Sequence, residues 1–496
     1  MKKLLCLLLT ICVCMTLLVG CSASSGDMNY SDGSFSRNQG ISPGADESDY
    51  RYEAIKENGF VKTDEQANSY FSLDRNTASY SYMRRQINEN RLPNYESVRV
   101  EEYVNYFNYD YARPADGNAL ALSDSLFDCP WNANHKLLTI GVAAEEIEFS
   151  SKQNNLVFLI DTSGSMYGSD RLPLVQQAFS VLIDNLSAND TVSVVTYAGD
   201  SRIALEGESG ANKTKIAAVI EDLSASGSTN GQGGIEKAYA LAQKYFAQGG
   251  NNRVILATDG DFNVGASSKT DITELISQKR DSAIFLTVLG VGLCNTSDVT
   301  MKTLAENGNG NYAYLDSVAE ATRVLAVELG GTVNVVAKDA KIAVSFNKDV
   351  VSSYRLIGYE SKMMSEEEYE DENKDAGEIG SGHTVTAVYE IELKSEVTQG
   401  VVATAEVSFK DPSTNENKKV NAEFALSDYT ATPSEDSVFI GCVIEYGLLL
   451  RNSAYKGDAT FAAVAARLEG LQCAHDGNFK QEFAELVAKA AALSDK

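Results

Sequence analysis

The sequence predicts an α/β fold, in which a doubly wound, mainly parallel sheet is inserted in a β-sandwich-like domain, with helical segments at the N-terminus and the C-terminus. Two observations support this prediction. Short apolar runs alternate with helical patterns between residues 155 and 329, which is typical of a parallel sheet covered by helices on both faces. After that stretch, apolar and polar residues alternate with a period of two, as in antiparallel strands that bury one face.

The composition indicates a large globular protein and disfavours a nucleic-acid role. The chain has 496 residues, of which 44% are hydrophobic and 22% are charged, so it can bury a sizeable core. Its 42 basic and 69 acidic residues give a net charge of −27. Nucleic-acid binding requires Lys and Arg to neutralise phosphates, and this chain has the opposite charge. The presence of only three histidines argues against histidine-based zinc or triad chemistry.

The N-terminus indicates an exported lipoprotein. Residues 1–20 begin with a positive start and continue as an apolar run shorter than the ~20 residues of a membrane-spanning helix, which is typical of a signal peptide. Leu18-Val19-Gly20-Cys21 resembles a bacterial lipobox, which implies acylation of the Cys21 thiol and cleavage before it. Residues 21–54 are poor in aliphatic side chains and are expected to form a flexible tether. The mature protein is therefore expected to be lipid-anchored to the bacterial cell membrane or envelope through Cys21.

An N-terminal helical segment is expected over residues 55–115, with helices at Tyr82–Asn90 and Val98–Tyr106. A β-sandwich-like domain is expected to combine residues 116–150 with residues 335–428. Its predicted strands are Ala340–Phe346, His383–Ile391 and Val401–Phe409, with which Leu137–Gly141 is expected to pair. The α/β domain, residues 151–334, would then occupy a loop of the sandwich.

The elements of the α/β domain follow from continuous apolar runs and from helical spacing. The predicted strands are Asn155–Ile160, Thr191–Tyr197, Arg253–Ala257 and Ile284–Leu289. One helix is expected to begin near Pro173, a residue that suits a first helical turn. Further helices are expected at Ile235–Gln248, Ile272–Arg280 and Val318–Leu329. Residues 429–496 are expected to form a C-terminal helical segment with helices at Asp436–Arg451, Ala459–Leu471 and Asn478–Leu493.

Three polar loops adjoin the predicted strands and helices of the α/β domain. Asp161-Thr162-Ser163-Gly164-Ser165 directly follows the first strand, Gly227–Gly231 precedes the Ile235 helix, and Thr258–Asp261 directly follows the Arg253 strand. In such folds, ligands bind beyond the carboxyl ends of the strands. The set, Asp-x-Ser-x-Ser followed by a Thr and then an Asp, resembles the metal-ion-dependent adhesion site (MIDAS) of von Willebrand factor type A (VWA) domains, which have a Rossmann-like fold.

This resemblance implies a divalent metal site. Ser163 and Ser165 would bind the metal through their hydroxyls, Thr229 would bind it directly or through water, and Asp161 and Asp259 would hold coordinated waters. Hard oxygen ligands of this kind suit Mg²⁺ (or Mn²⁺), which keeps several waters. A metal without a direct carboxylate ligand from this chain keeps much of its charge and favours a carboxylate from outside. The expected partner is therefore a protein that supplies a Glu or an Asp.

The order of the segments resembles a family of bacterial VWA lipoproteins with a family-specific N-terminal segment and a C-terminal domain of unknown function. The resemblance covers residues 65–495 and is carried by Phe71–Tyr80, Val98–Tyr111, Thr258–Gly265 and Lys374–Glu390. The resemblance implies the domain architecture of the chain more firmly than its biological function.

Three functions remain open at this point. The first is a lipid-anchored protein that binds its partner through the metal. The second is a structural scaffold of a cell-envelope complex with a vestigial metal site. The third is an unrecognised hydrolase, although no enzyme is expected, because the loops contain no recognised nucleophile, base, P-loop Gly-Lys-Ser/Thr or GxSxG motif.

Other conspicuous residues are expected to be structural. His383 should be a structural histidine at the start of a strand, and the acidic run Glu366–Glu372 should be a solvated loop rather than a second, calcium-type site. The cysteines outside the signal form no CxxC motif, so a zinc knuckle is not expected, and both a disulfide and free thiols remain open. They are Cys129, Cys294, Cys442 and Cys473.

Overall fold

The fold is that of a computed structural model, which describes residues 55–115, 117–149, 152–260, 269–280, 282–292, 298–475 and 479–494. All of them belong to one compact unit. The predicted signal peptide, the tether and Cys21 lie outside the described residues, as do Asp261 and Cys294. In the described part of the chain, no helix is long and apolar enough to cross a membrane.

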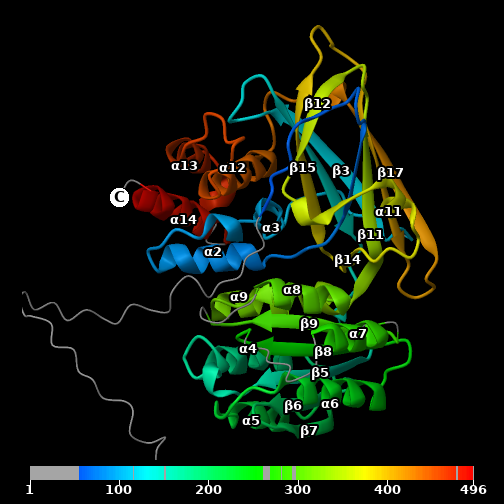
Figure 1. The fold of residues 1–496 in the computed structure, drawn as a ribbon, viewed down its shortest axis with the longest axis vertical. Coiled ribbons are helices and arrows are strands. Elements are labelled where there is room, and N and C mark those ends of the chain that lie inside the picture. Colours follow the sequence, from blue (N-terminus) through cyan, green and yellow to red (C-terminus); the bar gives the residue numbers. More distant parts are fainter. Residues whose placement is uncertain are drawn as a thin grey trace, which may run out of the picture. The chain divides into compact units, whose positions relative to one another are not determined.

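A six-stranded sheet with the order β10-β9-β8-β5-β6-β7 forms the centre of the α/β domain (Figure 1). Its strands are β5 (Asn154–Asp161), β6 (Thr191–Tyr197), β7 (Ser201–Ser209), β8 (Asn251–Thr258), β9 (Phe285–Gly290) and β10 (Tyr312–Tyr314). All neighbours pair in parallel except β7, which is antiparallel to β6 at one edge. The predicted mainly parallel sheet is therefore confirmed.

Helices cover both faces of this sheet because alternate side chains of each strand point to opposite faces. On β5, Phe158 packs into the cluster that contains Phe179 of α4, while Leu159 packs into the cluster that contains Ile235 of α6. The helices are α4 (Leu172–Asp184), α5 (Lys213–Glu221), α6 (Gly231–Lys244), α7 (Lys269–Arg280), α8 (Asp298–Asn307), α9 (Val318–Thr322) and α10 (Leu329–Val333), with a short 3₁₀ turn η4 (Gly164–Met166). The predicted single helix Val318–Leu329 differs from the structure, because a π-helical segment, η5 (Arg323–Val327), separates α9 from α10.

Two antiparallel sheets form the β-sandwich. Their strands come from the residues before and after the α/β domain in the sequence. The first has the order β1 (Val61–Lys62), β12 (Val351–Ile357), β15 (Thr384–Leu393), β4 (Lys136–Ala144) and β3 (Leu120–Asp128). The second has the order β13 (Met363–Met364), β2 (Asn68–Ser72), β11 (Val335–Phe346), β16 (Val401–Lys410) and β17 (Asn417–Ala425), and β14 (Gly377–Gly380) pairs with β11. The expected pairing of Leu137–Gly141 is confirmed, since β4 lies antiparallel to β15. The α/β domain lies between β4 and β11, as the inserted arrangement requires.

Residues 55–115 are not purely helical, which corrects the expectation for this segment. They contain α2 (Ala78–Asn88), η2 (Tyr95–Ser97) and a short α3 (Val100–Val104), but also β1 and β2. Phe71 of β2 pairs with Ile342 of β11, so this segment supplies a strand to the sandwich core. The sequence did not reveal this pairing because the two partners lie far apart along the chain.

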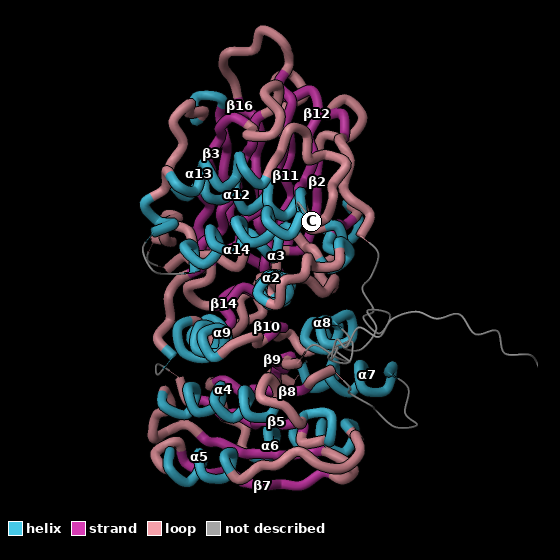
Figure 2. Tube along the Cα trace, turned by 90° about the vertical axis from the view of Figure 1, so that its left-hand side faces the viewer, coloured by secondary structure: helices cyan, strands magenta, loops and turns pink. Residues whose placement is uncertain are grey.

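Three C-terminal helices pack with α2 and α3 against the first sheet of the sandwich (Figure 2). They are α12 (Glu435–Leu450), α13 (Phe461–Glu469) and α14 (Phe479–Ser494), with short 3₁₀ turns η7 (Leu426–Asp428) and η8 (Gln472–His475). Their core is aromatic: Tyr80, Phe439, Tyr446 and Phe483 are fully buried. Large aromatic surfaces of this kind contribute strongly to the stability of a core.

The acidic run is helical rather than a loop, which corrects a second expectation. Glu366–Glu370 form α11, which follows η6 (Glu360–Lys362). Ser365 and Glu368 make a capping box at its start, each side chain bonding the backbone of the other residue. The side chains of Glu366 and Glu367 are exposed, so the run is solvated as expected.

Buried charges join the end of the α/β domain to α2. Arg84 Nη2 of α2 lies 2.6 Å from Asp316 Oδ1 and 2.9 Å from Glu320 Oε2. Arg323 Nη2 lies 2.5 Å from Glu320 Oε1, and Arg323 Nη1 lies 2.8 Å from Glu328 Oε2. We call these five residues the junction network. Because an unpaired buried charge is costly, the network restrains how the α/β domain packs against α2.

Candidate metal centre

The carboxylate of Asp161 is fixed by hydrogen bonds at the carboxyl end of β5. The residue is fully buried. Its Oδ1 accepts the backbone N–H of Ser163 at 2.9 Å, and its Oδ2 accepts the hydroxyls of Tyr197 and Thr258, each at 3.0 Å. Burial raises the pKa of Asp161 to about 6, although the hydrogen bonds from Ser163 act in the opposite direction. This carboxylate is thus held in one orientation before any ligand arrives.

Two hydroxyls lie beside this carboxylate. The Oγ atoms of Ser163 and Ser165 are 3.0 Å apart, and the Ser163 side chain is almost completely buried. Ser165 lies in η4, the tight turn that follows β5, and this turn brings the two hydroxyls together. The Asp-x-Ser-x-Ser spacing therefore places one carboxylate and two hydroxyls within a single turn.

The loop that carries Thr229 is held against the same turn by backbone hydrogen bonds. The N–H of Gly164 donates to the carbonyl of Gly227 at 2.9 Å, and the N–H of Ser226 donates to the carbonyl of Thr162 at 2.8 Å. Gly227 has φ +81°, a conformation that favours glycine. Thr229 lies two residues after Gly227 and is half-buried. The backbone hydrogen bonds of Gly227 and Ser226 therefore place the Thr229 loop next to the paired serines.

Asp259 brings a second carboxylate to the site from the end of β8. It is fully buried, and its charge acts to raise the pKa of Asp161. Two buried carboxylates beside paired hydroxyls require a positive charge, and hard oxygen donors suit Mg²⁺. The residues present therefore fit a divalent cation. In the described part of the chain, no group of three or more His, Cys, Asp or Glu side chains is placed to hold a metal ion.

The structure adds one charged residue that the sequence analysis missed, Arg171. Its Nη1 lies 3.6 Å from Asp259 Oδ2 and donates to the carbonyl of Ser165. A Cβ on Gly292 would come 2.6 Å from Arg171 Nε, so a glycine at that position leaves room for the guanidinium. Arg171 lies outside the Asp-x-Ser-x-Ser motif, and no pattern in the sequence singles it out.

The surface around the centre has an exposed aromatic side chain. Tyr167, which follows η4, is 85% exposed. On the neighbouring loop, Asp170 Oδ2 lies 2.7 Å from Arg85 Nη2 of α2. The turn that carries the paired serines is thus followed by an aromatic side chain that faces solvent, and then by an ion pair to the N-terminal segment.

Comparisons with known proteins find three family matches along the chain. Residues 155–326 match the von Willebrand factor type A domain, residues 331–493 match the C-terminal domain of the uncharacterized protein YfbK, and residues 46–139 match a family described as von Willebrand factor. The uncharacterized protein YfbK of Escherichia coli (strain K12) is 37% identical over 472 residues, which are 90% of this chain and 82% of that protein. The chain belongs to the YfbK family of bacterial VWA proteins.

Other similarities cover less of this YfbK-family chain or are weaker. An uncharacterized protein from Synechocystis sp. is 30% identical over 207 residues, which are 41% of this chain and 47% of that protein. Inter-alpha-trypsin inhibitor heavy chain H2 of Mus musculus is 30% identical over 161 residues, 31% of this chain and 17% of that protein. A solved von Willebrand factor type A structure from Catenulispora acidiphila covers 78% of this chain and 89% of that chain, with 16% identity and a TM-score of 0.42.

The VWA domain indicates a protein-interaction or adhesion-type role for this YfbK-family chain. VWA domains often bind a divalent metal at the MIDAS. Asp161, Ser163, Ser165 and Asp259 lie together in the structure at the edge of the sheet where that site is expected, and the loop of Thr229 lies beside them. Metal binding by these residues stays a prediction.

Proposed function

We propose that this protein is an exported, lipid-anchored binding protein that uses a divalent metal in its VWA domain to hold a carboxylate of a protein partner. Asp161, Ser163, Ser165, Thr229 and Asp259 would hold Mg²⁺ or Mn²⁺. Cys21 would carry the lipid. Bound there, the metal supplies an electrophilic position that an incoming Glu or Asp can occupy.

One observation carries this proposal: two fully buried carboxylates lie beside a pair of hydroxyls at the carboxyl edge of a parallel sheet. Both oxygens of Asp161 already accept hydrogen bonds from the protein, so this carboxylate is better placed to orient a metal-bound water than to bind the metal directly. With little direct neutralisation by the chain, the ion would retain a strong attraction for an external carboxylate. Tyr167 would provide apolar contact area at the edge of the docking surface.

If the protein were a structural scaffold with a vestigial metal site, that site would be expected to lack metal ligands. Asp161, Ser163, Ser165 and Asp259 are all present, and the hydroxyls and the Asp161 carboxylate are organised by hydrogen bonds. Burying two carboxylates is costly, and the hydrogen bonds to Asp161 and the Arg171 guanidinium 3.6 Å from Asp259 offset part of that cost. The donor set therefore favours a working metal site. For the hydrolase alternative, we propose no catalytic role, since the described residues of these loops include no histidine, lysine or cysteine.

Partner capture from native envelope extract tests the proposal. The mature protein is immobilised in Mg²⁺ or in EDTA and compared with Asp259→Asn, with Asp222→Asn as the control, since Asp222 is an exposed carboxylate at the end of α5. We expect a partner that is captured in Mg²⁺ and released by EDTA, that is recaptured when Mn²⁺ is restored, and that is lost with Asp259→Asn but kept with Asp222→Asn. Capture that is indifferent to EDTA and to Asp259→Asn would instead establish the scaffold function.

A further inference from the structure

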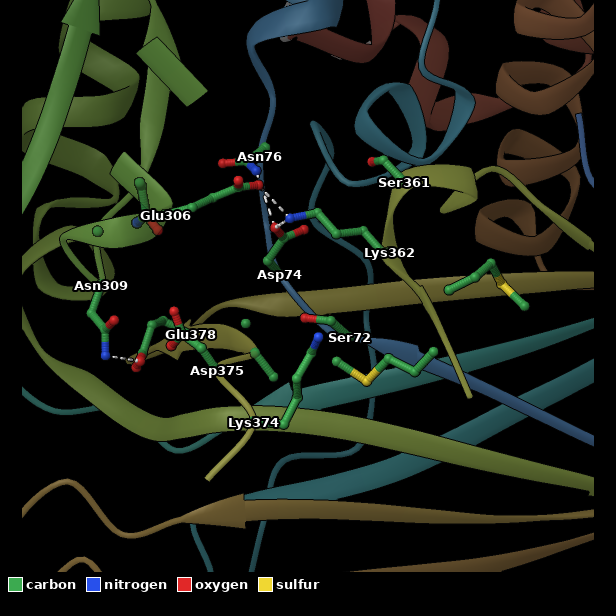
Figure 3. A pocket seen from close by; sticks show the side chains of 16 residues that line it. Ser72, Asp74, Asn76, Glu306, Asn309, Ser361, Lys362, Lys374, Asp375 and Glu378 are labelled. Carbon is green, nitrogen blue, oxygen red and sulfur yellow. Dashed lines mark hydrogen bonds and ion pairs between the residues drawn. The ribbon is translucent and has the colours of Figure 1, made fainter. Parts of the chain in front are cut away.

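A second polar pocket lies between the α/β domain and the β-sandwich, away from the metal centre. It has a volume of about 220 Å³. Glu306 lines it from the last turn of α8, and Asn309 lines it from the loop before the amino end of β10, whereas the metal centre lies at the carboxyl ends of β5 and β8. Asp74, Lys362 and Glu378 line it from the sandwich side (Figure 3). We call it the junction pocket.

Two oxygens in the wall of the junction pocket have no hydrogen-bond donor among the residues that the structure describes. Asn309 Nδ2 donates to Glu378 Oε1 at 2.6 Å, which fixes the two side chains against each other (Figure 3). The remaining oxygens, Asn309 Oδ1 and Glu378 Oε2, are buried and accept no hydrogen bond from the described residues. Asn309 is 4% exposed and Glu378 is 8% exposed. A buried acceptor without a donor costs about 1–3 kcal/mol, so these two atoms favour a ligand that brings N–H groups.

The charge of the lining favours a cation. Four carboxylates, those of Asp74, Glu306, Asp375 and Glu378, and two ammonium groups, those of Lys362 and Lys374, line the pocket, and Asp375 Oδ2 also lies 2.6 Å from Arg280 Nη1. Both lysines are already engaged. Lys362 Nζ contacts Asp74 Oδ2 and lies 2.5 Å from Glu306 Oε1, and Lys374 Nζ lies 2.6 Å from Glu368 Oε1. The half-buried ammonium of Lys362 is an example of a cation held by the carboxylates of these walls.

Glu378 is the carboxylate that most needs such a partner. Burial raises its pKa well above the ordinary range, and the charges of Asp339 and Asp375 act in the same direction. Lys338 and Arg253 act in the opposite direction but do not cancel these effects. A cation placed against Glu378 would favour the ionised form of this carboxyl group and so oppose the effects of burial, Asp339 and Asp375.

The backbone around the pocket is tightly packed, so its shape is defined before a ligand binds. A Cβ on Gly377 would come 1.6 Å from the carbonyl oxygen of Leu73, and a Cβ on Gly310 would come 1.7 Å from that of Leu286. Only glycine allows these approaches. Asn309 itself has φ +45°, a conformation in which Asn is tolerated better than most residues. The donors and acceptors of the wall are therefore pre-organised.

We propose that the junction pocket binds an organic cation that donates N–H hydrogen bonds, a primary ammonium or a guanidinium, through Glu378 and Asn309. The cation comes either from a free small amine or from a Lys or Arg side chain. Because Asn309 belongs to the α/β domain and Glu378 to the sandwich, a bound cation bridges the two and stabilises their packing. Anions are excluded by the excess of carboxylates, and a quaternary ammonium is excluded because it cannot donate to the two oxygens.

Calorimetric titration and thermal unfolding of the mature protein test this proposal. The probes are putrescine, agmatine and the blocked peptide Gly-Lys-Gly, with tetramethylammonium at equal ionic strength as the control. EDTA is present throughout, so that the metal centre takes no part and failure here says nothing about the proposed partner binding. We expect saturable binding and a raised Tm for at least one N–H donor, and neither for tetramethylammonium. Binding of the free amines identifies a small-molecule site, and binding of the peptide alone identifies a side-chain site.

Matched variants separate this site from non-specific attraction to an acidic protein. Glu378→Gln should weaken binding at least ~10-fold, which corresponds to the loss of one charged contact. Asp375→Asn, on the exposed rim, should weaken it a few-fold without disturbing a buried group. Glu423→Gln, which removes an exposed charge from β17, should change nothing. Binding that is absent for every probe, equal for tetramethylammonium, or unchanged in both Glu378→Gln and Asp375→Asn would overturn the proposal.

Discussion

Replacing Arg323 with methionine tests whether the junction network holds the α/β domain to the rest of the chain. Methionine keeps much of the length of the side chain but removes its charge. The substitution removes the ion pairs of Arg323 with Glu320 and Glu328, a hydrogen bond to Thr77 Oγ1 at 3.0 Å, and a cation–π contact 4.2 Å from the Tyr106 ring.

The expected loss of stability follows from the contacts that Glu320 and Glu328 keep in Arg323→Met. Glu320 keeps Arg84 Nη2 at 2.9 Å and the Tyr106 hydroxyl at 2.7 Å, and Glu328 keeps Arg75 Nη2 at 2.8 Å. Arg75 and Arg84, both buried, would then face the three carboxylates of Asp316, Glu320 and Glu328. One buried negative charge is left uncompensated. Breaking a buried pair in this way costs about 3–5 kcal/mol of the free energy of unfolding.

The loss of stability in Arg323→Met should become smaller as the pH falls. Burial acts to raise the pKa of Glu320, but the charges of Arg323 and Arg84 outweigh it and hold the pKa at about 2. A carboxyl group whose pKa is lowered by folding stabilises the protein above its unfolded pKa of about 4.3, and this contribution disappears as the pH falls toward 2. The difference between wild type and Arg323→Met should therefore be full at pH 7 and should shrink between about pH 4.5 and pH 2.

Urea unfolding followed by circular dichroism measures this difference. Lys244→Met is the matched control, since the pair of Lys244 with Glu206 is exposed to solvent and should contribute little to the free energy of unfolding. A loss below about 1 kcal/mol for Arg323→Met at pH 7 would refute the reasoning, because it would mean that the network contributes no more than surface pairs do.

Three further outcomes are expected. Arg171→Gln should raise the affinity for Mn²⁺ several-fold in calorimetric titration, because the guanidinium 3.6 Å from Asp259 competes with the metal for that carboxylate; an unchanged or weaker affinity would show that Arg171 does not oppose the metal. Tyr197→Phe should lower the free energy of unfolding by about 1–3 kcal/mol, since Asp161 Oδ2 loses one buried donor, and no loss in urea unfolding would contradict this geometry. Gly377→Ala should lower the Tm or abolish folding, because its Cβ would meet the Leu73 carbonyl oxygen at 1.6 Å. Gly470→Ala is the control and should be tolerated, because its Cβ would lie 3.4 Å from the nearest atom. Equal effects of the two substitutions in thermal unfolding would argue against the close approach at Gly377.

The α/β domain was predictable because its signals are local. Continuous apolar runs mark β5, β8 and β9, and Asp161, Ser163 and Ser165 lie within one turn of sequence. Asp259 joins them through a general rule, that the carboxyl ends of parallel strands meet at one edge of the sheet. Arg171 could not be found in this way, because its role depends on where one rotamer of a long side chain points.

The rest of the fold depends on contacts that no local pattern records. β2 is a strand because it pairs with β11, and Asn309 meets Glu378 only after the α/β domain has docked on the sandwich. The helix α11 is different, since its capping box, Ser365 followed by Glu368, is a local pattern from which a short helix could have been predicted. Local chemistry thus predicted the candidate metal centre, and tertiary packing produced the junction pocket.

Titration of the mature protein with Mn²⁺, followed by electron paramagnetic resonance of the free ion, tests the central claim most directly. The account predicts one saturable site in the wild type, displaced by Mg²⁺, and its loss in Ser163→Ala and in Asp259→Asn while both variants keep the wild-type circular dichroism spectrum. Unchanged Mn²⁺ binding in both folded variants, or no saturable site in the wild type, would contradict it.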